Sequence, residues 1–116
     1  MDKSLAKSKE DFIELQLQPA DKIIFIDELL FSFTITARGI CSEVLSTDAE
    51  KLEALKWLNE LVHRIWNLRF DIQQDNYKDF GNRLFDNFKF HCEESKLLCD
   101  HLESTILNIL KNFKKE

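Results

Sequence analysis

The most constraining feature of the sequence is a hydrophobic stretch at residues 23–41, IIFIDELLFSFTITARGIC. Read as a helix at about 100° per residue, it has an apolar face that predicts a core contact. That face consists of Ile26, Leu29, Leu30, Phe33, Ala37, Ile40 and Val44. Ile24, Phe31 and Ile35 fall on the opposite side, at spacings of seven and four residues, where polar side chains are expected. These three side chains must be covered either by the N-terminal segment or by a second subunit, and we predict a homodimer interface there.

Two other structures compete for this stretch. The run FSFTITA at residues 31–37 alternates and is rich in β-branched residues, which is typical of a strand. A transmembrane helix needs about 20 apolar residues with few charges. The stretch is borderline in length and contains Asp27 and Glu28, so we expect no membrane span.

Composition favours helices over sheets for the whole chain. The 116 residues include only two glycines and one proline, the residues on which the tight turns of a sheet depend. A chain of this length can bury one substantial core, so we predict a single all-α domain at residues 1–116, with frayed ends at 1–4 and 114–116. The ten phenylalanines would supply much of the core volume.

The helix boundaries follow from capping and turn residues. Thr47 and Glu50 form the sequence pattern of a capping box, which predicts the start of a helix. Four helices are expected, at about 4–16, 19–45, 48–73 and 77–113. The apolar arc of the last helix is interrupted only by His91 and Ser95. Short links between the three long helices predict an antiparallel up-down bundle, with the short N-terminal helix beside it.

The charge and the cysteine content of the chain limit which partners and which cellular compartment are expected. The net charge is −5, while the lysine-bearing ends are basic, so the middle of the chain is strongly acidic. We therefore do not expect a broad nucleic-acid-binding surface. A nucleic-acid-associated protein that uses its two basic ends remains an alternative. An acidic face suits a basic protein partner or simple solvation. The odd number of cysteines predicts free thiols and a cytoplasmic location.

Several polar residues fall on apolar helix faces and could carry chemistry. Arg69 would either extend to solvent, pair with Asp27 or Glu28, or bind an anion. His91 and Ser95 lie one helical turn apart and are expected to be a buried hydrogen-bonded pair.

Cysteine and histidine spacing predicts no metal site and no cofactor. On one continuous helix Cys92 and Cys99 would be roughly 10 Å apart, too far for a disulfide, so they are expected to be structural core thiols.

The outer side of the helix expected at 48–73 carries polar residues next to aromatic ones, a combination typical of partner-binding surfaces. These residues are Asn59, His63, Arg64, Trp66, Asn67 and Phe70. The alternative is that a fourth helix covers Trp66 and Phe70.

The sequence contains no catalytic constellation, and we expect a small acidic cytoplasmic helical protein that acts by binding another protein. An inhibitor, immunity or adaptor protein has this size and charge, by analogy. The alternative is a ligand-binding or hydrolytic bundle with a polar pocket between helices around Arg69, His91 and Arg38, with His63 nearby.

Overall fold

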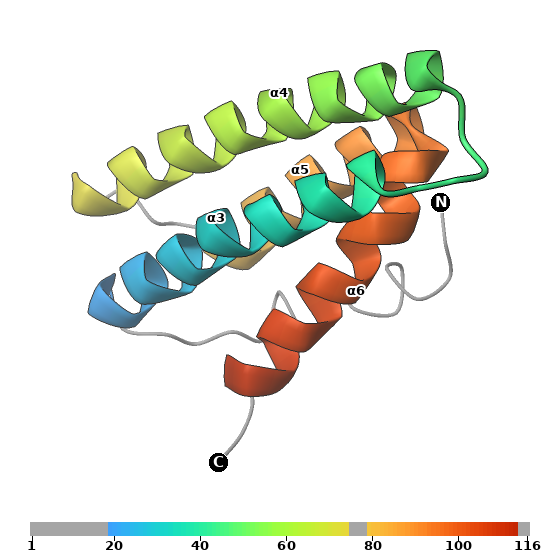
Figure 1. Cartoon of the computed structure of the whole chain (residues 1–116). Helices are drawn as coiled ribbons and strands as arrows, with labels where there is room; N and C mark the ends of the chain where they lie inside the picture. The colour runs from blue at the N-terminus through green and yellow to red at the C-terminus, as the bar shows by residue number, and fades with distance from the viewer. Residues whose placement is uncertain (1–18, 75–78, 114–116) are drawn as a thin grey trace.

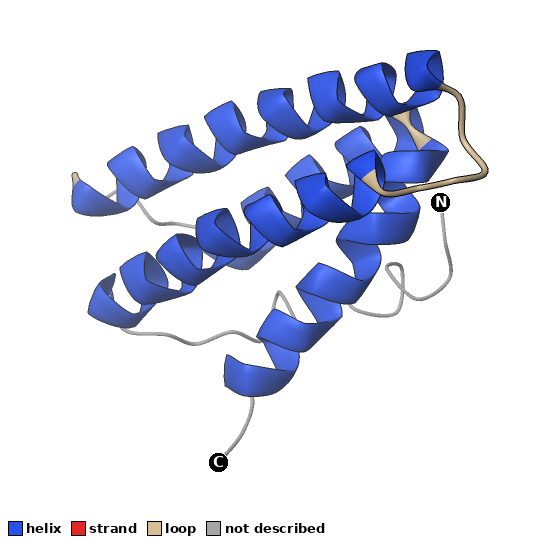
Figure 2. Ribbon diagram, in the orientation of Figure 1, coloured by secondary structure: helices blue, strands red, loops and turns tan. Residues whose placement is uncertain are grey.

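The structure is a computed structural model that describes residues 19–74 and 79–113. Over these ranges the chain is helical and contains no strand (Figure 2). The helices are α3 (Pro19–Cys41), α4 (Asp48–Gln73), α5 (Phe80–Glu94) and α6 (Lys96–Phe113). The predicted all-α class is confirmed, and the strand alternative for 31–37 is wrong, because these residues lie inside α3. The helix predicted at 4–16 lies outside the described residues.

The four described helices share one hydrophobic core. In Figure 1, α4 lies alongside α3, α5 lies behind this pair, and α6 crosses it at an angle as it leads to the C-terminus. The largest completely buried side chains come from all four helices. They are Phe25, Ile26, Leu29 and Ile40 of α3, Leu61, Ile65 and Leu68 of α4, Leu84 and Phe88 of α5, and Leu98 of α6. The shared core leaves one side of α3 and one side of α4 facing outward.

Helix α3 ends at Cys41, four residues earlier than the predicted end at residue 45. The N–H of Ser42 donates to the carbonyl of Arg38, and the N–H of Glu43 donates to that of Ile40, which tightens the last turn. Val44 then lies in the connection to α4 and is 87% exposed instead of belonging to the core face. Gly39 does not end the helix, and the chain leaves it only two residues later.

The start of α4 agrees with the capping pattern in the sequence. Thr47 is the N-cap, its hydroxyl accepts from the N–H of Glu50 at 3.1 Å, and Glu50 Oε1 accepts from the N–H of Thr47 at 2.8 Å. Two backbone donors at the helix start are satisfied reciprocally in this way. The predicted bounds of 48–73 for this helix are confirmed.

The single last helix predicted at 77–113 is wrong, because the chain breaks at Ser95 into α5 and α6. Ser95 has extended backbone angles, φ −147° and ψ 117°, and its Oγ accepts a hydrogen bond from the N–H of Leu98 at 3.1 Å. This is the geometry of an N-cap residue, so Ser95 starts a new helix instead of continuing the old one. The break lets α6 turn and pack against α3 and α5 (Figure 1).

Helices α3 and α6 approach closely at Gly39. A Cβ atom at this position would lie 2.7 Å from Nδ1 of His101, so the imidazole ring rests on the bare glycine backbone. The other ring nitrogen, Nε2, lies 3.0 Å from Glu43 Oε2 in the loop after α3. Further along, the hydroxyls of Thr36 and Thr105 are hydrogen-bonded at 2.9 Å. Polar contacts therefore fix how α6 crosses α3.

Candidate functional site

The outward side of α3 carries three large apolar side chains that the described residues leave uncovered. Ile24 is 51% exposed, Phe31 68% and Ile35 60%. The helix phase predicted from the sequence is correct, since the opposite side of α3 is buried. The three side chains predicted for a dimer interface thus form one exposed row on α3, referred to below as the α3 stripe.

The outward side of α4 carries the second predicted group, and all six of its residues are exposed. They are Asn59, His63, Arg64, Trp66, Asn67 and Phe70, referred to below as the α4 stripe. No described helix covers Trp66 or Phe70, which are 51% and 61% exposed. Leu52 continues this row towards the start of α4 and is also exposed. Sequence reasoning missed Leu52, although its place seven residues before Asn59 was an available signal.

A polar cluster links the two stripes across the junction of α3 and α4. Arg69 Nε donates to Asp27 Oδ1 at 2.7 Å, and its guanidinium lies 5.6 Å from the centre of the Trp66 ring. The hydrogen bond to Asp27 raises the pKa of Arg69, so the guanidinium stays charged. Of the three predictions for Arg69, the structure shows the pairing with Asp27. The contact between the guanidinium and the ring favours one orientation of the exposed Trp66 side chain.

A shallow, mainly apolar groove of about 350 Å³ separates the two stripes. It is lined by Leu30, Phe33, Thr34 and Ala37 of α3 and by Leu55, Leu58, Asn59 and Val62 of α4. Leu30 and Ala37 were predicted to lie on the core face of α3, but they are only partly buried, as are Leu55 and Val62 of α4. The apolar surface therefore continues from one helix to the other.

The buried polar residues do not form the predicted pair. Nδ1 of His91 lies 2.7 Å from the carbonyl oxygen of Asn87, one turn earlier in α5, while Ser95 caps α6. The His91 ring is buried and packs edge-on against Trp57, with centroids 6.1 Å apart. Trp57 thus packs on α5. Both polar residues serve the local structure of the α5–α6 corner.

The two buried cysteines come together because of the break at Ser95. Cys92 and Cys99 are free thiols that interact through a hydrogen bond, so the separation of roughly 10 Å expected for one straight helix does not apply. Burial, followed by the neighbouring Cys99, raises the pKa of the Cys92 thiol strongly. A thiol that resists ionisation is a poor nucleophile and a poor metal ligand.

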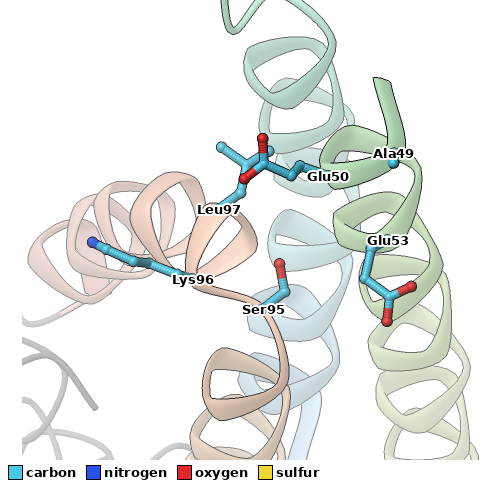
Figure 3. A pocket seen from close by; sticks show the side chains of 6 residues that line it. All are labelled: Ala49, Glu50, Glu53, Ser95, Lys96 and Leu97. Atoms are coloured by element: carbon cyan, nitrogen blue, oxygen red, sulfur yellow. The ribbon is translucent and has the colours of Figure 1, made fainter. Parts of the chain in front are cut away.

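A second groove of about 320 Å³ lies where the start of α4 meets the α5–α6 corner (Figure 3). Its polar side chains already have structural roles. Glu50 belongs to the capping box, Glu53 accepts from Trp57 Nε1 at 2.9 Å, and Ser95 caps α6. The Lys96 side chain extends away from these carboxylates in Figure 3. The groove thus gathers no group that is available for chemistry.

The residues of the predicted polar pocket are not brought together. Arg38 is exposed near the end of α3, Arg69 pairs with Asp27, and His91 is buried in α5. None of the three lines either groove. Within residues 19–74 and 79–113, no three His, Cys, Asp or Glu side chains converge in a way that could hold a metal ion. No helix in the described part of the chain has the length and apolarity needed to cross a membrane.

Comparison with known proteins gives no further guide. No protein family, no curated protein and no solved structure matched this chain.

Proposed function

We propose that the protein is a small acidic interaction protein of the cytoplasm, and that it binds another protein through the outer surface of α3 and α4. The observation that carries the proposal is the exposure of large apolar side chains on this one surface. The α3 stripe, Leu52, Trp66 and Phe70 are each at least half exposed. Contiguous exposed apolar surface on a small protein is typical of an interaction site.

The chemistry of the α4 stripe supports recognition of an unlike partner. Its aromatic residues, Trp66 and Phe70, are surrounded by amide and basic side chains, and aromatic and arginine residues are enriched at the energetic centres of interfaces. Arg64 Nε donates to Glu60 at 2.8 Å, and the Arg69 guanidinium lies 5.6 Å from the centre of the Trp66 ring, so these side chains already have contacts that favour one conformation and lower the entropy cost of binding. A partner would meet a largely preformed surface.

The α3 stripe supports self-association as a second use of the same surface. Ile24, Phe31 and Ile35 recur along α3 at spacings of seven and four residues, and this regular spacing suits contact with another helix. In this proposal the helices follow the up-down order expected from their short links, and the protein acts by binding without catalysis. An inhibitor, immunity or adaptor role fits such a molecule.

The experiment that tests this proposal compares partner capture by three forms of the purified chain. The wild type, a Trp66→Ala/Phe70→Ala variant and a Leu107→Ala variant are used as bait in an extract of the native cells, Leu107 being an exposed apolar residue of α6 outside the proposed surface. We expect a partner that the wild type and Leu107→Ala retain and that Trp66→Ala/Phe70→Ala loses, since hot-spot aromatics cost about 2 kcal/mol or more each on truncation.

Purified partner then serves to measure the dissociation constant of each form directly. Circular dichroism checks that all three baits have the same helix content, which is expected because the substituted side chains are exposed. Equal binding of a partner by all three forms would place the contact elsewhere and would contradict the proposal.

A further inference from the structure

The α3 stripe is part of a longer regular pattern that also contains charges. Ile24, Glu28, Phe31, Ile35 and Arg38 follow one another at spacings of four, three, four and three residues. This is the spacing of the contact positions in a coiled coil, where each step returns to the same side of the helix. All five residues are exposed. Two apolar side chains lie at the centre of the pattern, with one acidic and one basic residue at equal distances on either side.

The two charged residues of this pattern are available for an external partner. Glu28 and Arg38 form no ion pair with any other described residue. Their neighbour Asp27 is already paired with Arg69 across the junction with α4. This row of five residues, referred to below as the seam, therefore presents one acidic and one basic side chain, ten residues apart on the same side of α3.

We propose that α3 pairs with α3 of a second copy of this chain in an antiparallel, two-fold symmetric contact centred between Phe31 and Ile35. This inference rests on the proposed function and specifies the partner for the α3 stripe. In this register Phe31 lies opposite Ile35 of the second copy. Glu28 lies opposite Arg38 of the second copy, and the symmetry forms each of these pairs twice.

Charge complementarity selects both the partner and the direction. In a parallel pair, Glu28 would face Glu28 and Arg38 would face Arg38, and like charges across an interface are unfavourable. In the antiparallel register both charges of each chain are matched by the other. The pattern is therefore complementary to itself, which an unlike partner would not require.

The contact between two single helices is small. It falls below the roughly 1,600 Å² of a standard interface, so a micromolar dissociation constant is expected. The measurement must therefore reach protein concentrations of several hundred micromolar.

The test is a charge-reversal cycle followed by sedimentation equilibrium. Glu28→Lys or Arg38→Glu alone should raise the dimer dissociation constant by about tenfold or more, because each places like charges opposite one another twice. The double variant Glu28→Lys/Arg38→Glu restores both pairs with inverted signs and should return the dissociation constant to within about threefold of wild type. Asp86→Lys, the same charge change on an exposed residue of α5, should leave the dissociation constant unchanged.

Zero-length cross-linking gives an independent readout of the register. In an Arg38→Lys variant, a carbodiimide should join the Glu28 carboxylate of one copy to the amine introduced at position 38 of the other. Mixing isotopically light and heavy chains shows that the linked peptides come from two molecules.

The outcomes separate this inference from the proposed function. A wild-type chain that stays monomeric at several hundred micromolar overturns the second copy as the occupant, while capture of an unlike partner through Trp66 and Phe70 would still stand. A dimer whose double variant is as weak as the single variants overturns the antiparallel register. If no partner is captured through Trp66 and Phe70 but the charge-reversal variants behave as predicted, the dimer is supported and the binding of an unlike partner is not.

Discussion

At the scale of single residues, one close approach of α3 and α6 depends on a missing side chain. Glycine inside a helix is ordinarily unfavourable by about 1 kcal/mol relative to alanine. At Gly39 the absence of a Cβ makes room for the ring of His101, which Glu43 holds from the other side. The local cost of the glycine is thus offset by the packing of α6 on α3.

Substitution of Gly39 by alanine should therefore destabilise the protein only while the His101 ring is present. We expect Gly39→Ala alone to lower the free energy of unfolding by about 1 kcal/mol, because the overpacking cost exceeds the helix propensity gained. In a His101→Ala background the same substitution should instead raise it, by up to about 1 kcal/mol. Urea unfolding of the four chains measures both effects. The same sign in both backgrounds would show that the contact does not matter.

The capping box at Thr47 predicts a specific dependence of stability on pH. The hydrogen bonds from the backbone and hydroxyl of Thr47 lower the pKa of Glu50 from its ordinary value of 4.5. A carboxyl whose pKa is lower in the folded state stabilises the fold above pH 4.5, and this contribution is lost as the pH falls through the folded pKa.

We therefore expect wild type to melt at a higher temperature than Glu50→Gln at neutral pH, and this advantage should shrink as the pH falls through the range below the ordinary value. Glu93→Gln, at an exposed glutamate of α5 without a hydrogen bond among the described residues, is the matched control. Melting curves of wild type and Glu50→Gln that stay equally far apart at every pH would contradict the role assigned to Glu50.

The sequence was sufficient for Thr47 and Glu50 because both partners of that interaction lie within one helical turn. The contact of His101 with Glu43 joins residues 58 positions apart, and no local pattern indicates which helices will cross there. The pairing of Arg69 with Asp27 was one of three possibilities, because the side chain alone does not say whether α3 or solvent lies beside it. Local chemistry was predictable, and long-range partners were not.

At the scale of elements, the corner at Ser95 was the main feature that sequence periodicity concealed. The apolar residues of α5 and α6 keep one continuous helical phase, so the pattern predicts a single helix. The break does not interrupt that phase, and only the capping preference of serine indicates it. The pattern predicts that Ser95 is a polar residue within the core of one helix, whereas this serine starts a second helix.

Removal of the cap at Ser95 should have a larger effect than removal of another serine from the same helix. Ser95→Ala leaves the N–H of Leu98 without its acceptor in a buried setting, and we expect it to lower the free energy of unfolding by about 1–2 kcal/mol. Ser104→Ala, on the exposed side of α6, should have little effect or a slightly favourable one. Denaturant unfolding of both variants decides this, and equal effects would mean that Ser95 is not a cap that matters for stability.

At the scale of the whole molecule, the all-helical class was predictable from composition, and the exposed side of α3 was predictable from the spacing of its apolar residues. What the sequence could not supply was whether another part of the same chain covers Ile24, Phe31 and Ile35, because coverage depends on the packing of all helices together. The described residues leave these three side chains exposed, with the α4 stripe beside them. We infer that the α3 stripe binds a second copy of this chain, and that the α4 stripe binds another protein.

Sedimentation velocity of the wild type and of Phe31→Asp, from one to several hundred micromolar, tests self-association through the α3 stripe. Phe31 is 68% exposed, so the substitution should leave the fold intact, which circular dichroism verifies. We predict that the wild type shifts from monomer to dimer with rising concentration, and that Phe31→Asp remains a monomer because a charge at the centre of the seam is costly to desolvate. A wild type that sediments as a monomer throughout, indistinguishable from Phe31→Asp, would contradict self-association through α3.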